Sequence, residues 1–419
     1  MTDAKDSIWH NRNFLVLWSS QTISLFGSSI SGLAVPLIAV LLLHATPAQM
    51  GMLKGAETVP FILFGLVAGV WVDRMRRLPI LFVSDFCRAL LLFCIPLAHH
   101  FGLLHIHLLY AVIFASSVFN VFYMVAYGSF LPSLVARSQL VDANSKLSLS
   151  VSVAQTAGPA LGGLLIELMG APNAITLDAL SFLASASLLF TIKTREEPVA
   201  AGAMQGGLVS EIKTGLAFIW HDALFRALTL RLTAWQLIVG LNEVLVILLM
   251  AQELKFSPGR IGVVYAFLGG GLFVGAFFAR HISLRLGVGN TIVASVLFGA
   301  LSAILIPFAA GGDLMATAML ALALFLHGFF VILYQINNAS LRQAMTPNHL
   351  LGRMNATTRF LTLGVRPLGA MVGGLLAGVI GLRLTMGLSI GIGIALALFG
   401  VTASALRRIV KLPETAKTT

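Results

Sequence analysis

Long apolar runs separated by short polar segments make up most of the chain. Each run is close to the ~20 residues that an α-helix needs to cross the ~30 Å hydrocarbon core of a bilayer. The pattern therefore predicts an all-α membrane protein with about twelve membrane-spanning helices. The expected spans are residues 14–43, 49–72, 79–98, 108–133, 146–168, 174–192, 227–250, 259–280, 289–310, 314–343, 355–380 and 384–406.

One long hydrophilic connection, residues 193–226, divides these spans into two sets. Its first part, Lys193–Gly207, is rich in alanine, glycine and charge, which is typical of a linker. Its second part, Glu211–Ala223, carries apolar side chains on one helical stripe and predicts an amphipathic helix at the membrane surface. The expected domains are an N-terminal six-helix bundle over 1–192, a cytoplasmic linker over 193–226, a C-terminal six-helix bundle over 227–406 and a cytoplasmic tail over 407–419.

A sequence repeat supports a division of the chain into two six-helix halves. The segment Leu140–Asn144 is followed by the pair Gly162–Gly163, and Leu351–Asn355, 211 residues later, is followed at the same spacing by Gly373–Gly374. Parallel repeats of six helices, related by an axis along the membrane normal, are a transporter architecture. We therefore expect two pseudo-symmetric halves with a substrate site near the midplane between them.

Basic residues gather in alternate loops, and this asymmetry predicts the orientation of the chain. The loop between the second and third spans carries Arg74, Arg76 and Arg77, whereas the loops on the opposite side hold few basic residues. Both termini are therefore predicted to be cytoplasmic, in a multi-pass protein of the inner or plasma membrane. Because the net charge of +11 is concentrated in short loops, we exclude nucleic acid as a partner.

Composition and motifs exclude several other classes of protein. Hydrophobic residues make up 58% and charged residues 10% of the chain, whereas soluble domains carry about 25% charged residues. No HExxH or Walker sequence is present, so we expect neither an enzyme nor a cofactor. The histidines at positions 99, 100, 105 and 107 are loosely spaced without an adjacent acid, so no metal site is expected.

Two motifs resemble those of a known family. The loop Gly69-x-x-x-Asp73-Arg74-x-x-Arg77 resembles the signature between helices 2 and 3 of the major facilitator superfamily, although Arg76 stands where many members have glycine. Gly158-Pro-Ala-Leu-Gly-Gly163 resembles the helix-5 motif of its proton-coupled exporters. The chain is similar, more narrowly, to macrolide-efflux and enterobactin-exporter proteins over Gln21–Gly27, Asp73–Arg77, Asp85–Arg88, Ala157–Gly163 and Gly352–Gly369.

The resemblance implies a gating role for the basic loop. Asp73 would face the N-terminus of the eleventh helix near Arg353–Asn355, where free backbone N–H groups favour an anion. This contact would hold the outward-facing state closed on the inside, and a solvated loop acid is the alternative interpretation. Arg74 and Arg77 fit such a network and a simple topology signal equally well.

Gating or conformational roles are also expected inside the spans. The resemblance implies that small residues and a proline on helix 5 make a kinked contact with helix 8 that hinders leakage; ordinary packing of small residues is the alternative. These residues are Gly158, Pro159, Gly162 and Gly163. Asp85 and Arg88 lie three apart on helix 3 and can pair on one face. Because each neutralises the other, we interpret this pair as mainly structural.

Ionisable residues within the spans are the best functional signal, because a charge at mid-membrane is costly. Glu57 on helix 2 and Glu243 on helix 7 have no obvious local partner. A carboxylate in an apolar site can bind and release a proton, so both are proton-coupling candidates. The alternative for each is an acid near a loop that water reaches. Arg366 on helix 11 would either hold a carboxylate partner or steady its helix.

Polar and aromatic residues within the spans are candidates for lining a substrate cavity. Aromatic faces with a few hydrogen-bonding groups suit bulky amphiphilic ligands, and hydrogen bonding between helices is the alternative role. The cavity candidates are Gln21, Ser24, Asn120, Tyr123, Tyr127, Trp235, Gln236, Tyr334, Asn337 and Asn338.

These features predict a secondary active transporter that exports small amphiphilic molecules, such as drugs, macrolides or siderophore-like compounds, by proton antiport with alternating access. Its expected partners are a small-molecule substrate, protons and the lipid bilayer, and we expect a monomer. A proton-coupled importer or a flippase for lipid-like molecules remains an alternative of the same fold. A membrane enzyme or a non-transporting receptor would need a catalytic site or a signalling domain that the sequence does not show.

Overall fold

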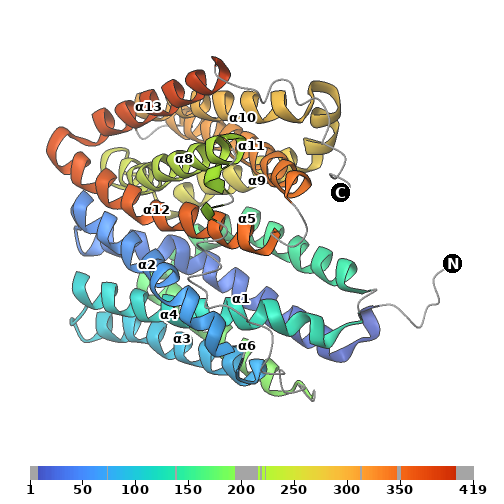
Figure 1. Cartoon of the computed structure of the whole chain (residues 1–419). Helices are drawn as coiled ribbons and strands as arrows, with labels where there is room; N and C mark the ends of the chain where they lie inside the picture. Colours follow the sequence, from blue (N-terminus) through green and yellow to red (C-terminus); the bar gives the residue numbers. More distant parts are fainter. Residues whose placement is uncertain are drawn as a thin grey trace, which may run out of the picture. The chain divides into compact units, whose positions relative to one another are not determined.

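The computed structural model describes residues 8–72, 74–136, 139–193, 216–217, 219–221, 223–311, 314–346 and 351–402, and these residues contain no strand. Within these described residues, twelve long helices follow one another (Figure 1). They are α1 (Arg12–Leu37), α2 (Pro47–Val72), α3 (Arg77–His100), α4 (Ile106–Leu134), α5 (Leu140–Met169), α6 (Ala171–Phe190), α8 (Ala223–Leu248), α9 (Pro258–Leu286), α10 (Val288–Ser302), α11 (Leu314–Met345), α12 (Leu351–Ile380) and α13 (Leu382–Thr402).

This architecture confirms the predicted all-α membrane fold. Among the described residues, ten helices are long and apolar enough to cross a bilayer. Each expected span coincides with one observed helix, as α4 does with the expected span 108–133. Large apolar side chains such as Phe190 (80% exposed) and Phe277 (75% exposed) lie on the outside of the helices, which suits a surface surrounded by lipid.

The chain forms two compact units. Unit 1 comprises Met1–Ala45, Met52–Ala203 and Ser257–Gly262, and unit 2 comprises Thr46–Gly51, Met204–Phe256 and Val263–Thr419. Two helices, α2 and α9, therefore begin in one unit and continue in the other. The expected amphipathic segment lies mostly outside the described residues.

Unit 1 is built around α1. This helix packs against α5 and α6, and α3 packs against both α4 and α6. Its apolar core includes Phe14, Leu81, Phe130 and Leu189, which are all fully buried. The core therefore joins α1, α3, α4 and the end of α6.

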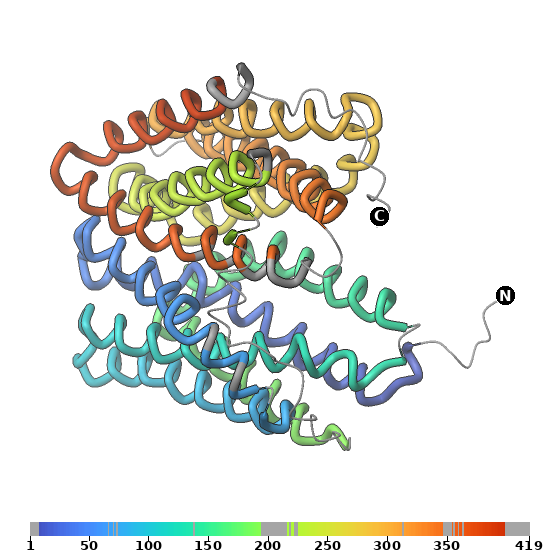
Figure 2. Tube along the Cα trace, in the orientation of Figure 1, coloured from blue at the N-terminus to red at the C-terminus, as the bar shows by residue number. Residues whose placement is uncertain are grey.

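Unit 2 is arranged around α8 and α10. α8 packs along α12, whereas α10 packs along α11 and α13. Its apolar core includes Leu228, Ile292, Tyr334 and Leu341. Figure 2 follows the trace through these helices, from α8 in green to α13 in red.

The backbone repeats in the second half what it does in the first. α1 ends in the π-helical turn Ile38–Leu42, followed by His44 with φ 49°. The π-helical turn Leu249–Glu253 ends α8 in the same way, and Lys255, 211 residues after His44, has φ 51°. A left-handed conformation is uncommon for residues other than glycine, so this agreement supports the pseudo-symmetric halves that the sequence repeat predicts.

Candidate functional site

A buried group of charges lies within unit 1, between α3 and α6. Asp85 and Arg88 come from α3, and their predicted pairing is present, although Nη1 of Arg88 lies 3.9 Å from Oδ1 of Asp85. The hydroxyl of Ser185 on α6 donates to Oδ2 of Asp85 at 2.6 Å. The Asp85 side chain is fully buried, so its charge depends on the groups packed around it, with Arg88 and Ser185 as its favourable partners.

Asp178 on α6 joins the same group and was missed by the sequence analysis. Its side chain is buried and interacts electrostatically with Arg88 and Asp85. Ser181 donates to its Oδ1 at 3.2 Å. α1 approaches closely, because a Cβ added at Gly27 would lie 2.5 Å from Oδ1 of Asp178. The sequence does offer a signal for Asp178, because it is a single acid in the apolar span 174–192 and a charge within a span is costly.

The charges in this acid cluster, defined as Asp85, Arg88 and Asp178, do not balance. It contains two carboxylates and one guanidinium, and the guanidinium also lies over the ring of Phe182 at 3.9 Å. Oδ1 of Asp85 and Nε of Arg88 are buried without a hydrogen-bond partner in the described part of the chain. A buried charge without compensation is costly, so the excess carboxylate makes this cluster a candidate for binding one proton. Reversible proton binding is the chemistry that this arrangement supports.

The expected cavity residues of unit 1 lie beside this cluster. Tyr123 donates its hydroxyl hydrogen to Oε1 of Gln21 at 2.7 Å and stacks on Tyr127 with ring centroids 6.0 Å apart. The Tyr123 side chain also interacts electrostatically with Asp85 and Arg88. Ser24 donates to the backbone oxygen of Gln21, and Asn120 is half-buried on α4. The cluster is thus joined to polar groups on α1 and α4.

The expectation that Glu57 and Glu243 lack partners is wrong. Lys54 lies one turn before Glu57, 2.8 Å from its Oε2, and Glu57 is half exposed. Oε2 of Glu243 accepts from Nη2 and Nε of Arg366 at 2.8 and 3.1 Å. Of the two roles considered for Arg366, the structure therefore shows the carboxylate partner.

In unit 2, two of the expected cavity residues make hydrogen bonds between or along helices. Asn337 accepts from Ser283 of α9 at 2.7 Å, and Asn338 donates to the hydroxyl of Tyr334 at 3.2 Å. Both asparagines are buried. Gln236 is half-buried on α8.

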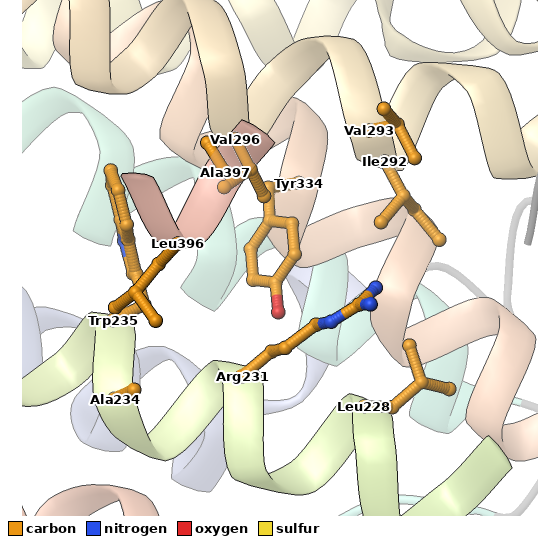
Figure 3. A pocket seen from close by; sticks show the side chains of 10 residues that line it. All are labelled: Leu228, Arg231, Ala234, Trp235, Ile292, Val293, Val296, Tyr334, Leu396 and Ala397. Atoms are coloured by element: carbon orange, nitrogen blue, oxygen red, sulfur yellow. The ribbon is translucent and has the colours of Figure 1, made fainter. Parts of the chain in front are cut away.

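Trp235 and Tyr334 do line a pocket in unit 2. It encloses about 590 Å³, including its open mouth, between α8, α10, α11 and α13. Figure 3 shows the Tyr334 hydroxyl and the Arg231 side chain directed into the same space, with Trp235 to one side. Arg231 is the one charged residue among its lining residues and was not singled out in the sequence.

The glycines of helix 5 bring helix backbones into contact. Within unit 1, a Cβ added at Gly163 would lie 2.5 Å from the Pro258 carbonyl oxygen and 2.9 Å from the Cα of Gly262, in the first turns of α9. Gly158 and Gly162 instead face Ser29 and Ile30 of α1. Small residues on α5 therefore serve two different contacts.

The same contact recurs in unit 2 between equivalent positions. Gly374 of α12 meets the carbonyl oxygen of Pro47 at the start of α2, and a Cβ added at Gly51 would lie 2.7 Å from the Ala370 carbonyl oxygen. These residues lie 211 positions from their counterparts in the α5–α9 contact. The first turns of α2 and α9 are therefore each packed against a glycine of a neighbouring helix, α12 and α5 respectively.

Glu167 adds an interaction to one of these contacts alone. Its Oε2 accepts from the backbone N–H of Gly259 at 2.9 Å and from the hydroxyl of Ser257 at 3.1 Å. A carboxylate at a helix N-terminus binds unpaired N–H groups and complements the helix dipole. The equivalent position on α12 is Gly378, so the start of α2 has no such acid from its partner helix.

We expect Glu167→Ala to loosen the first turn of α9, because the substitution removes the carboxylate that accepts from the Gly259 N–H and the Ser257 hydroxyl. Amide hydrogen exchange at Gly259 and Arg260 should accelerate roughly threefold, as expected for loss of about 0.7 kcal/mol of local protection. Leu168→Ala, at the neighbouring exposed position, is the matched control. Equal exchange in both variants would show that Glu167 does not hold this turn.

The basic loop is only partly described. Asp73 and its expected contact lie outside the described residues. Arg74 is exposed, and Arg77 is the first residue of α3.

Comparisons with known proteins agree with this architecture. A family model described as transmembrane secretion effector matches residues 7–418. The chain is 26% identical over 414 residues to the multidrug efflux pump Tap of Mycolicibacterium fortuitum, covering 96% of this chain and 97% of that protein. It is 26% identical over 392 residues to the uncharacterized MFS-type transporter YfiS of Bacillus subtilis, covering 90% and 89%.

Solved structures share the fold at low sequence identity. The nucleoside transporter NupG is similar with a TM-score of 0.73 and 12% identity, covering 94% of this chain and 98% of that chain. A bacterial homologue of the iron transporter ferroportin, in an inward-facing state, has a TM-score of 0.72 and 15% identity, covering 94% and 99%. At these identities the likeness shows the fold alone.

Proposed function

Because the chain belongs to the transmembrane secretion effector family, within the major facilitator superfamily of transporters, we propose that it exports small amphiphilic molecules in exchange for protons. Export is supported by the likeness to the multidrug efflux pump Tap along 96% of the chain. Proton coupling is supported by one observation, the charge imbalance of the buried acid cluster. The uncompensated carboxylate gives the protein a place to carry a proton within the membrane.

In the proposed cycle the acid cluster alternates between a proton-bound and a proton-free state. With one proton bound, the remaining carboxylate balances the guanidinium of Arg88. Release of the proton leaves one excess negative charge, which is stable only if water or a cation reaches it. Protonation therefore biases the packing of α1, α3 and α6, and a two-state equilibrium that protons bias is what antiport requires.

We assign the proton to this cluster rather than to Glu57 or Glu243. Each of those glutamates has one cation for its one carboxylate, from Lys54 and Arg366 respectively. Ionisation of either glutamate therefore leaves no excess charge. Both remain the alternative carriers, and their glutamine variants separate the two assignments.

We propose a monomer in the inner or plasma membrane with both termini cytoplasmic, an orientation supported by the basic loop around Arg74. The bundles over 1–192 and 227–406 would move as the two halves, joined by the linker 193–226. Asp73, with the α5 glycines, would control access to the cavity.

The proposed function is tested with purified protein in liposomes under an imposed pH gradient. Ethidium and tetraphenylphosphonium, which are permanent cations, and erythromycin, which is a weak base, serve as probes of amphiphilic cargo. We expect at least one probe to move against its gradient in the direction opposite to protons, and an uncoupler to abolish this movement. Movement that persists unchanged after the pH gradient is collapsed would remove proton antiport.

A further inference from the structure

The pocket of unit 2 contains positive charge that has no counterion among its lining residues. Arg231 projects into it from α8, and Arg342 on α11 lies close enough to interact electrostatically with Tyr334, as Arg231 also does. Nε and Nη1 of Arg342 are buried without a hydrogen-bond partner in the described chain. Neither guanidinium has a carboxylate within ion-pair distance among the residues that the structure describes.

The rest of the pocket is apolar or aromatic. Its walls include Leu228, Ile292, Val296 and Leu396, with the indole of Trp235 at one side (Figure 3). The Tyr334 hydroxyl oxygen accepts from Asn338 at 3.2 Å, so its own hydrogen is free to be donated to a ligand. The guanidinium of Arg231 and the phenol of Tyr334 therefore offer donors to a space whose lining residues include no carboxylate, and Arg342 lies close enough to Tyr334 to add its positive field.

We propose that this pocket binds an amphiphile with one anionic group. The anionic group, a carboxylate, sulfonate or phosphate, would accept from Arg231 and Tyr334 and lie in the field of Arg342. The apolar body would pack against Trp235 and the aliphatic walls. Buried guanidinium groups are paired in stable structures, and an anionic ligand would supply the partner that the described residues do not. The inference rests on the proposed transport function, whose cargo class it specifies.

Binding is measured with full-length protein in nanodiscs of phosphatidylcholine, without a pH gradient. The probes are dansylaminoundecanoic acid and its methyl ester, which share the apolar body and differ in charge. Charge-assisted hydrogen bonds are about twice as strong as neutral ones, so the acid should bind about tenfold more tightly than the ester. Equal affinity of the two probes for the wild-type protein would overturn the proposal.

Variants locate the preference within the pocket. Arg231→Gln should abolish most of the preference for the acid, whereas Arg231→Lys, which keeps the charge, should retain most of it. Tyr334→Phe removes only the phenolic donor and should lower the preference roughly threefold. Arg285→Gln, at an exposed position of α9, is the matched control. An unchanged preference in folded Arg231→Gln protein would place the anion elsewhere and overturn the assignment.

The anion could come from cargo or from a phospholipid headgroup, and lipid composition separates these sources. If phosphatidylglycerol in the nanodiscs weakens binding of the acid in the wild type but not in Arg231→Gln, the site is occupied by anionic lipid. If phosphatidylglycerol has no effect on binding, and liposomes export the acid, the site binds cargo.

The anionic-ligand inference and the proposed antiport can fail separately. Ethidium efflux without any preference for the acid would overturn this inference alone. Preference for the acid without proton-dependent efflux would overturn the proposed antiport alone.

Discussion

Asp178→Asn should abolish proton-driven efflux while leaving the protein folded. Asparagine has almost the same shape as aspartate and keeps an oxygen for the hydroxyl of Ser181, which donates to Oδ1 at 3.2 Å in the native protein. It cannot bind or release a proton. The variant cluster holds one carboxylate and one guanidinium, which is the charge of the proton-bound native cluster, and it has lost one of its two titratable carboxyls. Transport driven by a pH gradient should fall at least about tenfold, which corresponds to 1.4 kcal/mol.

The decisive measurement compares two modes of transport in the same liposomes. Exchange of labelled for unlabelled cargo needs no net proton movement, so Asp178→Asn should retain exchange while it loses movement driven by the pH gradient. Asp142→Asn is the matched control, because Asp142 is half exposed and paired with Lys146 at 3.0 Å. If Asp178→Asn pumps at the wild-type rate with the wild-type dependence on pH, the proton is carried elsewhere. Glu57→Gln and Glu243→Gln then become the next variants to test.

The spans and the repeat were predictable because they depend on local sequence. A membrane-length run of apolar residues needs no knowledge of its neighbours, and α4 differs from its expected span 108–133 by two residues at its start. The contact of Asp85 with Arg88 was also predictable, because both lie on one helix at a spacing of three. Predictions of this kind hold because helical geometry alone determines the distance.

The missing parts of the site depend on which helix faces meet. Asp178 joins the cluster because α6 packs against α3 and α1, and nothing in the run 174–192 states that packing. In the sequence, Arg231 is a basic residue near the start of a span and nothing marks it further, although it projects into a pocket. Glu167 ends the fifth span and gains its role only because the first turn of α9 lies beside it. These contacts join helices far apart in sequence, so the local pattern of a single span does not predict them.

Gly163→Val should stop transport by displacing the first turn of α9 from α5. The added Cβ would lie 2.5 Å from the Pro258 carbonyl oxygen and 2.9 Å from the Cα of Gly262, both of which are backbone atoms that cannot rotate away. Overpacking of this kind costs about 1–3 kcal/mol, so states that contain this contact should become roughly five- to 150-fold rarer. A transport cycle that passes through such a state should slow by a similar factor.

Three further variants are the controls for this prediction: a smaller side chain at Gly163, the same change at an uncrowded glycine, and the same change at the equivalent glycine of the second half. Gly163→Ala adds the Cβ alone and should have a smaller effect, whereas Gly387→Val on α13 meets no atom within 4 Å of its Cβ and should transport normally. Gly374→Val should impair transport as Gly163→Val does, because it meets the equivalent Pro47 carbonyl at the start of α2. Thermal melting and membrane insertion of each variant distinguish a blocked cycle from a misfolded protein. Wild-type efflux by folded Gly163→Val protein would show that close approach of α5 and α9 is not part of the cycle, and the α5 glycines would then serve only to pack helices.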